Sequence, residues 1–102
     1  MIDLSTLVLD SFTPHVGTAF VLEHSEVQET FTLVDAKALP SYDHPMKKRD
    51  PFSLFFHGSR TDIQFNQQIL PLKHETMGEL EIFLVPIARN DDGTIRYQAV
   101  FN

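Results

Sequence analysis

Apolar and polar residues alternate along several short segments of the chain, a period of two that is typical of strands with one buried face. Phe20 and Leu22, for example, fall on one side of such a segment. Six segments share the pattern, the fourth most weakly: residues 18–24, 28–39, 51–57, 65–72, 79–88 and 94–101. Six short strands between turn residues predict an all-β fold, a small antiparallel six-stranded barrel or sandwich.

Turn residues and prolines indicate where these strands end or bend. The residues Asn90 to Gly93, Asn-Asp-Asp-Gly, are typical of a tight hairpin turn, because Asp and Gly tolerate positive φ angles. Pro86 has no N–H to donate, so it should lie at an edge or a bulge of its strand. We expect consecutive strands to pair as a meander whose closure removes exposed edges.

One short N-terminal helix is expected at residues 10–16. Asp10 or Ser11 can accept hydrogen bonds from the first free N–H groups of a helix. Pro14 suits an early helical position, and Gly17 suits the left-handed residue that follows a helix.

Composition places this fold in a small acidic protein. The 102 residues fit one domain, residues 1–102, with a formal net charge of −6. An excess of carboxylates disfavours nucleic acid as a partner. No run approaches the ~20 apolar residues that span a bilayer, and no signal peptide is recognisable, so we expect no membrane partner. The absence of cysteine excludes disulfides and fits a cytoplasmic location.

The chain lacks the motifs that usually carry chemistry. Its five histidines have no metal-binding spacing, and no nucleophile motif is present, so we expect no enzyme activity, no metal and no cofactor. The carboxylates near strand ends are interpreted mainly as a solvated face; they are Glu23, Glu26, Glu29, Glu75, Glu79 and Glu81. An enzyme, if the chain were one, would use His57 or His74 with Glu79 or Glu81.

Large apolar residues occur on both faces of two predicted strands. Phe55 is out of phase with Phe52 and Phe56, and Phe83 and Val85 are out of phase with the apolar residues around them. One face fills the core, and the other needs cover from the short helix, through Phe12 and Val16, from the long loop around residues 40–50, or from another chain. The candidate interface residues are Phe55, Phe83, Val85 and the basic run Lys47, Lys48 and Arg49.

Three stretches, residues 51–58, 77–87 and 97–102, together with Phe12 and residues 16–20, resemble a family of roughly hundred-residue bacterial proteins of unknown function. The resemblance covers nearly the whole chain and implies a stand-alone all-β domain. Members are often encoded beside phage-tail-collar-like proteins, which implies an accessory or assembly role. The family offers no established catalytic residues. The loop 44–49 is more basic here than the family pattern suggests.

These observations predict a non-enzymatic structural or interaction module. Its partner would be a second copy of the chain, giving a homo-oligomer, or a larger, phage-tail-like protein assembly. The alternative is a small-ligand-binding β-barrel with an aromatic cavity lined by Phe31, Phe52, Phe56 and Tyr97.

Overall fold

The computed structural model describes residues 6–24, 27–40 and 50–101, and it confirms an all-β fold with one short helical segment. The helical segment consists of α1 (Leu9–Phe12) and the 3-10 turn η2 (Thr13–His15). The strands are β1 (Ala19–His24), β2 (Val27–Ala38), β3 (Phe52–Gly58), β4 (Gln68–His74), β5 (Gly78–Arg89) and β6 (Ile95–Phe101). No helix among the described residues has the length and apolar character needed to cross a membrane.

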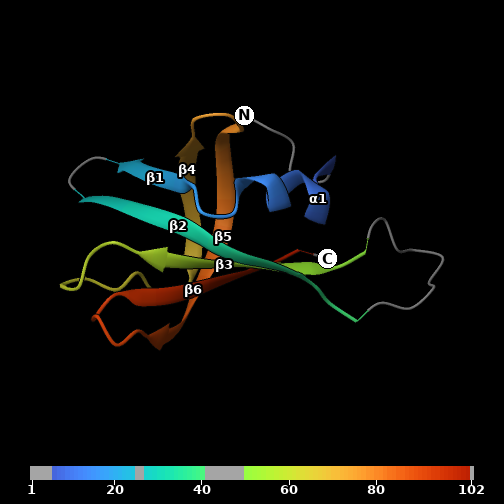
Figure 1. Ribbon diagram of the computed structural model, residues 1–102. Helices are drawn as coiled ribbons and strands as arrows, with labels where there is room; N and C mark the ends of the chain where they lie inside the picture. The colour runs from blue at the N-terminus through green and yellow to red at the C-terminus, as the bar shows by residue number, and fades with distance from the viewer. Residues whose placement is uncertain (1–5, 25–26, 41–49, 102) are drawn as a thin grey trace.

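The six strands form a closed antiparallel barrel in the order β1-β2-β3-β6-β5-β4. The predicted meander is therefore wrong, because β3 pairs with β6 instead of β4, and β4 pairs with β1. The physical reason lies in the connection from β3 to β4, whose residues 59–67 are too many for a tight hairpin and cross to the far side of the barrel. In Figure 1, β4 and β5 run nearly upright, whereas β1, β2, β3 and β6 run across the view.

The long strands β2 and β5 each pair with one neighbour near the start of their length and with another toward the end. The first part of β2 pairs with β1 and the rest with β3, with a register shift between Leu33 and Asp35. The first part of β5 pairs with β4, and the rest pairs with β6, with a shift between Pro86 and Ala88. The shift beside Pro86 confirms the expected irregularity, and such bulges let a strand bend as a barrel closes.

The inward positions of the strands make the core that the alternation predicts. Phe20, Phe31 and Tyr97 are among the fully buried side chains. Several rings are in contact: Phe31 meets Tyr97 edge-on at 5.1 Å between centroids, and Phe52 stacks on Phe101 at 4.8 Å. Apolar burial on this scale is the main term that holds a small barrel together.

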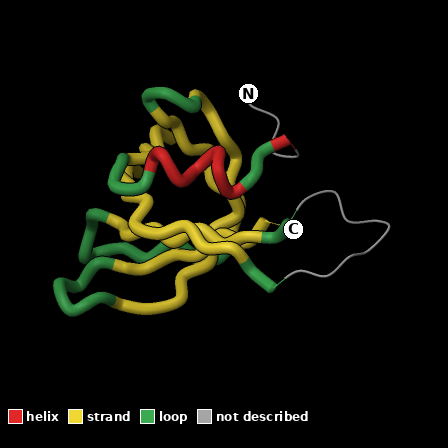
Figure 2. The backbone as a smooth tube through the Cα atoms, turned by 45° about the vertical axis from the view of Figure 1, so that its right-hand side comes forward, coloured by secondary structure: helices red, strands yellow, loops and turns green. Residues whose placement is uncertain are grey.

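The helical segment closes one end of the barrel (Figure 2). Phe12 is fully buried, with its ring 5.9 Å from Phe52 and 5.5 Å from Phe101. The predicted helix 10–16 is in fact shorter in its α-helical part, and Val8 is its N-cap, so the capping predicted for Asp10 or Ser11 is wrong. Ser11 Oγ instead accepts a hydrogen bond from the Val8 N–H.

The fourth strand begins later than predicted, at Gln68 rather than near Phe65. Phe65 belongs to the connection before β4, where its N–H donates to the Tyr97 hydroxyl at 3.0 Å and its ring lies 5.8 Å from Phe31. A side chain that packs on the core from a connection shows the same apolar signal as one in a strand. The hairpin between β5 and β6 forms as predicted, with Gly93 at φ +91°.

Candidate interaction surface

An apolar pair lies on the outer face of the β4–β5 hairpin. Ile69 and Phe83 are direct cross-strand partners, and their exposed fractions are 61% and 49%. Directly opposite residues on an antiparallel ladder point to the same side of the sheet. Their side chains therefore form one apolar patch facing water, and we call Ile69 and Phe83 the β4–β5 patch.

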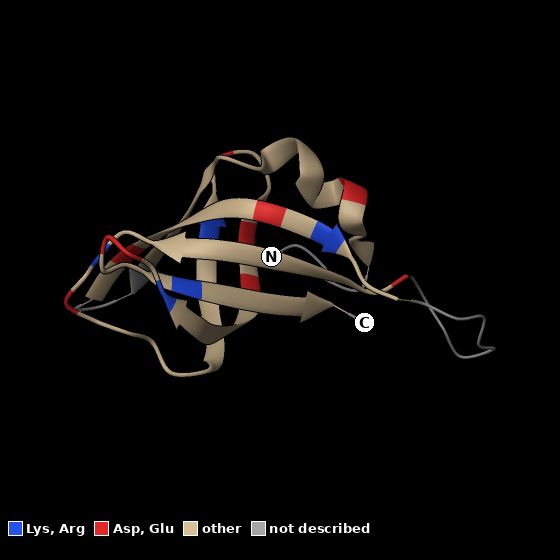
Figure 3. Cartoon of the chain, turned by 60° about the horizontal axis from the view of Figure 1, so that its bottom comes forward, with Lys and Arg blue, Asp and Glu red and all other residues tan. Residues whose placement is uncertain are grey.

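The next outward rows of the same two strands are charged. Glu81 lies opposite Pro71, and Glu79 lies opposite Lys73. All four residues are exposed, and the charged positions can be followed in Figure 3, where acidic residues are red and basic residues blue. Lys73 lies opposite Glu79, whereas Glu81, in the row nearest the β4–β5 patch, has no basic residue opposite it.

The outer surface continues from Phe83 along β5 to Val85 and then across to β3. Val85 pairs with Gln98 on β6, and Gln98 pairs with Phe55 on β3. The three apolar residues predicted for an interface, Phe55, Phe83 and Val85, thus lie on the outside of the barrel, on two strands that are separated by β6. Phe83 is the most open of them, because Val85 and Phe55 are half-buried.

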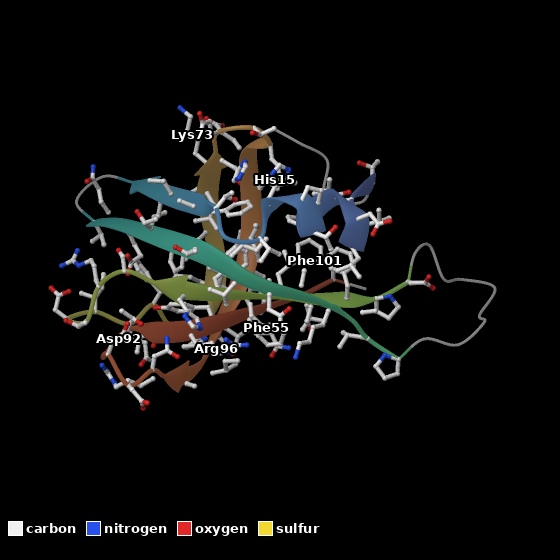
Figure 4. The ribbon with its side chains drawn as sticks, viewed as in Figure 1. His15, Phe55, Lys73, Asp92, Arg96 and Phe101 are labelled. Atoms are coloured by element: carbon white, nitrogen blue, oxygen red, sulfur yellow. The ribbon has the colours of Figure 1, made fainter. Side chains whose placement is uncertain are left out.

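Phe55 is covered in part by side chains of its own chain. The Arg96 guanidinium lies over the Phe55 ring, 4.6 Å from its centroid, and Lys37 Nζ is 5.9 Å from the same centroid. Arg96 Nη1 also donates to His57 Nε2 at 2.9 Å. We call Lys37, Phe55, His57 and Arg96 the cationic face; Figure 4 shows Phe55 and Arg96 side by side on it.

The helical segment does not cover Phe55, Phe83 or Val85, although the sequence left it open as a candidate for doing so. Phe12 is buried at the end of the barrel, and Val16 is itself 43% exposed. The basic run Lys47, Lys48 and Arg49 lies outside the described residues. Its contribution to an interface stays a prediction.

His74 has a structural role, which we infer from its hydrogen-bond partners. It is 4% exposed, and its Nδ1 accepts hydrogen bonds from the N–H groups of Thr76 at 3.0 Å and Met77 at 3.1 Å. Because Nδ1 accepts, the hydrogen is on Nε2, which donates to Thr18 Oγ1 at 2.9 Å. The Thr18 hydroxyl in turn donates to the carbonyl oxygen of His15.

Burial lowers the pKa of His74, and the nearby His15 lowers it further, whereas Glu75 acts in the opposite direction. The His15 ring lies edge-on to it at 4.6 Å between centroids, and the Phe20 ring lies at 4.5 Å. A neutral imidazole between two turns fits this setting.

Glu29 is the second buried polar group that alternation did not predict. Its side chain is 3% exposed, and its carboxylate accepts from the N–H groups of Thr30, Ser59 and Arg60, and from the Ser59 hydroxyl. The prediction that Glu29 belongs to a solvated face is therefore wrong. The carboxylate ties the start of the β3–β4 connection to β2.

The residues considered for an enzyme are not arranged as an acid–base pair among the described residues. The hydrogen-bond partner of His57 is Arg96, and those of His74 are Thr18, Thr76 and Met77. Within residues 6–24, 27–40 and 50–101, no group of three or more His, Asp or Glu side chains lies close enough to hold a metal ion. The turn residue Asp92 accepts hydrogen bonds from Thr94, which hold the pKa of that carboxyl below its usual range.

The four aromatic residues considered for a ligand cavity belong to the packed core. Phe31, Phe52, Phe56 and Tyr97 are at most 1% exposed. Each of them lies within contact distance of another ring: Phe31 of Tyr97, Phe56 of Phe20, and Phe52 of Phe12 and Phe101. A small barrel filled by side chains is the usual arrangement.

Sequence reasoning missed two residues of the outer surface. Ile69 lies in the strand with the weakest alternation. Only the register of β4 with β5 shows that Phe83 is its cross-strand partner. The alternation in the last strand indicates that Arg96 faces outward, but its position over Phe55 depends on the non-sequential pairing of β3 with β6. A β3–β6 pairing would have required a signal for strand order, which local alternation does not contain.

Comparison with known proteins adds the family of the chain. No curated protein and no solved structure matches it. A family model described as a domain of unknown function, DUF6916, matches residues 7–101, which include all the strands of the barrel. This small β-barrel chain therefore belongs to the DUF6916 family.

Proposed function

We propose that this chain is a non-enzymatic interaction module that docks onto a larger structural protein through the β4–β5 patch. The observation that carries the proposal is the direct pairing of Ile69 with Phe83, both largely exposed on the outside of the barrel. Aromatic and large aliphatic side chains at the centre of a contact usually provide most of its binding energy. Val85 and Phe55 extend the same outer surface toward the area that a stable contact needs.

Charge favours a different protein over a second copy as the partner. Glu79 and Glu81 border the patch on the same face of β5, and the whole chain has a formal net charge of −6. In a two-fold dimer the same surface of each copy would meet, so two acidic borders would approach each other. We infer a partner that presents an apolar anchor bordered by Lys or Arg.

An accessory role in a larger, phage-tail-like assembly is the setting we propose for this contact. The support is the sequence resemblance together with an exposed patch whose charge disfavours pairing with itself. The engagement of His57 with Arg96, and of His74 with its turn, supports a role without catalysis.

The proposal is tested by comparing three immobilised proteins in extracts of the native cell. These are the natural chain, the double variant Ile69→Ser with Phe83→Ser, and the control Val16→Ser. Val16 has a similar exposed fraction, 43%, but lies beside the helical segment. Because all three positions are exposed, the variants should fold, which circular dichroism and urea unfolding would verify.

We expect one protein, bound by the natural chain and by Val16→Ser, to be lost from the double variant. Raising the salt concentration should weaken its capture, since the bordering carboxylates would contribute to binding. Equal capture by all three proteins would overturn the proposal. So would sedimentation showing that the natural chain forms a dimer which the double variant abolishes, because the patch would then join two copies.

A further inference from the structure

We propose that the cationic face is a second binding site, specific for an oxyanion such as a carboxylate or phosphate group, with Arg96 as its main contact. This site lies on β2, β3 and β6. It shares Phe55 with the outer surface beside the β4–β5 patch, but it does not depend on the docking proposed for that patch. Its starting observation is that the half-buried Arg96 has no carboxylate partner among the described residues.

The other basic residues near this face differ from Arg96 in their partners. Lys37 pairs with Asp35 at 3.4 Å, and Arg60, on the connection after β3, pairs with Asp62 at 2.6 Å. Arg89, on the neighbouring strand β5, also has no carboxylate partner among the described residues and donates to the carbonyl oxygen of Gly93, but its side chain is exposed to water, whereas that of Arg96 is half-buried. Partial burial also removes water from the guanidinium, which favours an anionic partner.

Two contacts hold the guanidinium in place without using most of its donors. The Phe55 ring supports its face at 4.6 Å, and His57 Nε2 accepts from Nη1 at 2.9 Å. Since arginine stays protonated, His57 must be the acceptor here, so its hydrogen is on Nδ1. Of the five N–H donors of a guanidinium, the remaining ones suit the planar, two-point contact that carboxylates and phosphates make.

The carboxylates that border this face already have partners. Asp35 accepts from the Ala36 N–H at 2.9 Å as well as pairing with Lys37. Asp92 accepts hydrogen bonds from the N–H and the hydroxyl of Thr94, which lower the pKa of its carboxyl. Neither carboxylate forms an ion pair with Arg96, so an external oxyanion would meet free donors there.

The experiment is a titration of the isotopically labelled natural chain, followed through its arginine side-chain and backbone NMR signals. Sodium acetate and sodium phosphate are added in separate series at constant ionic strength, with sodium chloride as the reference. The variants are Arg96→Gln and, as a matched control, Arg60→Gln. Arg60 is already paired with Asp62, so its loss should leave the cationic face intact.

We expect saturable shifts of the Arg96 signals and of neighbouring β3 and β6 amides with at least one of the two anions. Arg96→Gln should weaken that binding on the order of tenfold or more, since each charge-assisted hydrogen bond contributes substantially. Arg60→Gln should change it less than about twofold, because the Arg60 guanidinium is already paired with Asp62. The anion that saturates at the lower concentration identifies the carboxylate or the phosphate as the preferred group.

Two results would overturn the inference. One is that neither anion shifts the Arg96 signals beyond the chloride reference. The other is that Arg96→Gln binds the anion as well as the natural chain does, in which case the shifts report an adventitious ion only. A folded spectrum of Arg96→Gln is expected, because the side chain is on the outer face of β6.

Discussion

His74 shows how one buried side chain can make stability depend on pH. Its Nδ1 accepts two N–H groups of the turn before β5, and its Nε2–H donates to Thr18. Protonating Nδ1 would place a hydrogen against two donors and a charge in a buried site. The folded form therefore binds a proton less readily than the unfolded chain, which agrees with the lowered pKa of His74.

The free energy of unfolding should consequently fall as pH drops below about 6.5, the ordinary histidine pKa. Between that value and the lower pKa of the folded form, the unfolded chain binds more protons, and one group contributes a slope of at most about 1.4 kcal/mol per pH unit. Above about pH 6.5 this contribution is constant. Urea unfolding from pH 7.5 to pH 5 measures it.

The matched variant for that measurement is His74→Asn, whose side-chain oxygen can still accept from Thr76 and Met77. Because the two proteins differ only at position 74, the difference between their pH profiles isolates the contribution of His74. Parallel profiles for the natural chain and His74→Asn would show that His74 has no part in the pH dependence.

Glu29→Gln should destabilise the protein by about 1.5–3 kcal/mol, because an amide group would face the Arg60 N–H that now donates to the carboxylate. Glu79→Gln, on an exposed strand position, is the control and should change stability by less than about 0.5 kcal/mol. Urea unfolding at pH 7.5 compares the two. Similar losses for both variants would contradict the structural role of the buried carboxylate.

At the scale of elements, the helical segment is a lid over one end of the barrel. The sequence predicted a short helix but not its partners, because Phe12 meets β3 and β6, which are distant in the chain. Phe12→Ala should cost about 3–5 kcal/mol, as expected for the loss of a buried ring. Val16→Ala, at an exposed position, should cost far less. A loss below about 1 kcal/mol for Phe12→Ala would mean that the segment is not needed to close the core.

The seam between β1 and β4 is the shortest in the barrel, with three residue pairs against seven between β4 and β5. It ends at Leu72, beside Pro71, which has no N–H to continue the ladder. His74 belongs to this seam, so we expect amide exchange there to accelerate as pH falls below about 6.5, after correction for intrinsic rates. Uniform exchange across the β1–β4 and β2–β3 seams would contradict this prediction.

Strand positions were largely predictable from the sequence, whereas strand order was not. Inward residues such as Leu33, Leu54 and Leu80 follow the period of two and are fully buried. The pairing of β3 with β6 depends on how the long connection crosses the barrel, which no local pattern records. The burial of Glu29 and His74 was not predicted for a related reason: their hydrogen-bond partners come from the ends of other elements.

At the scale of the whole molecule, the closed barrel leaves its outer surface as the place where partners can bind. The strands form a continuous ring, so most backbone donors and acceptors are paired within the chain and recognition depends on side chains. Among the predicted interface residues, Phe83 was correctly placed on an outer face, but its partner Ile69 was not foreseen. The net charge of the chain could be predicted from its composition. Only the fold shows that Glu79 and Glu81 border the β4–β5 patch.

Because of that acidic border, we expect the isolated protein to be monomeric at tens of micromolar, a range in which weak self-association is not populated. Sedimentation equilibrium at low and high salt measures this. A monomer at both salt concentrations agrees with a heterologous partner. A dimer that strengthens with salt would show that repulsion between acidic faces is all that opposes self-association.

The most direct test of the central claim uses the absence of cysteine in the chain. A photo-crosslinker is attached to the single cysteine of purified Ile69→Cys or Val16→Cys protein, and each labelled protein is then added to an extract of the native cell. The account predicts one crosslinked protein from position 69 and none from position 16. Crosslinking of the same protein from both positions, or from neither, would contradict docking through the β4–β5 patch.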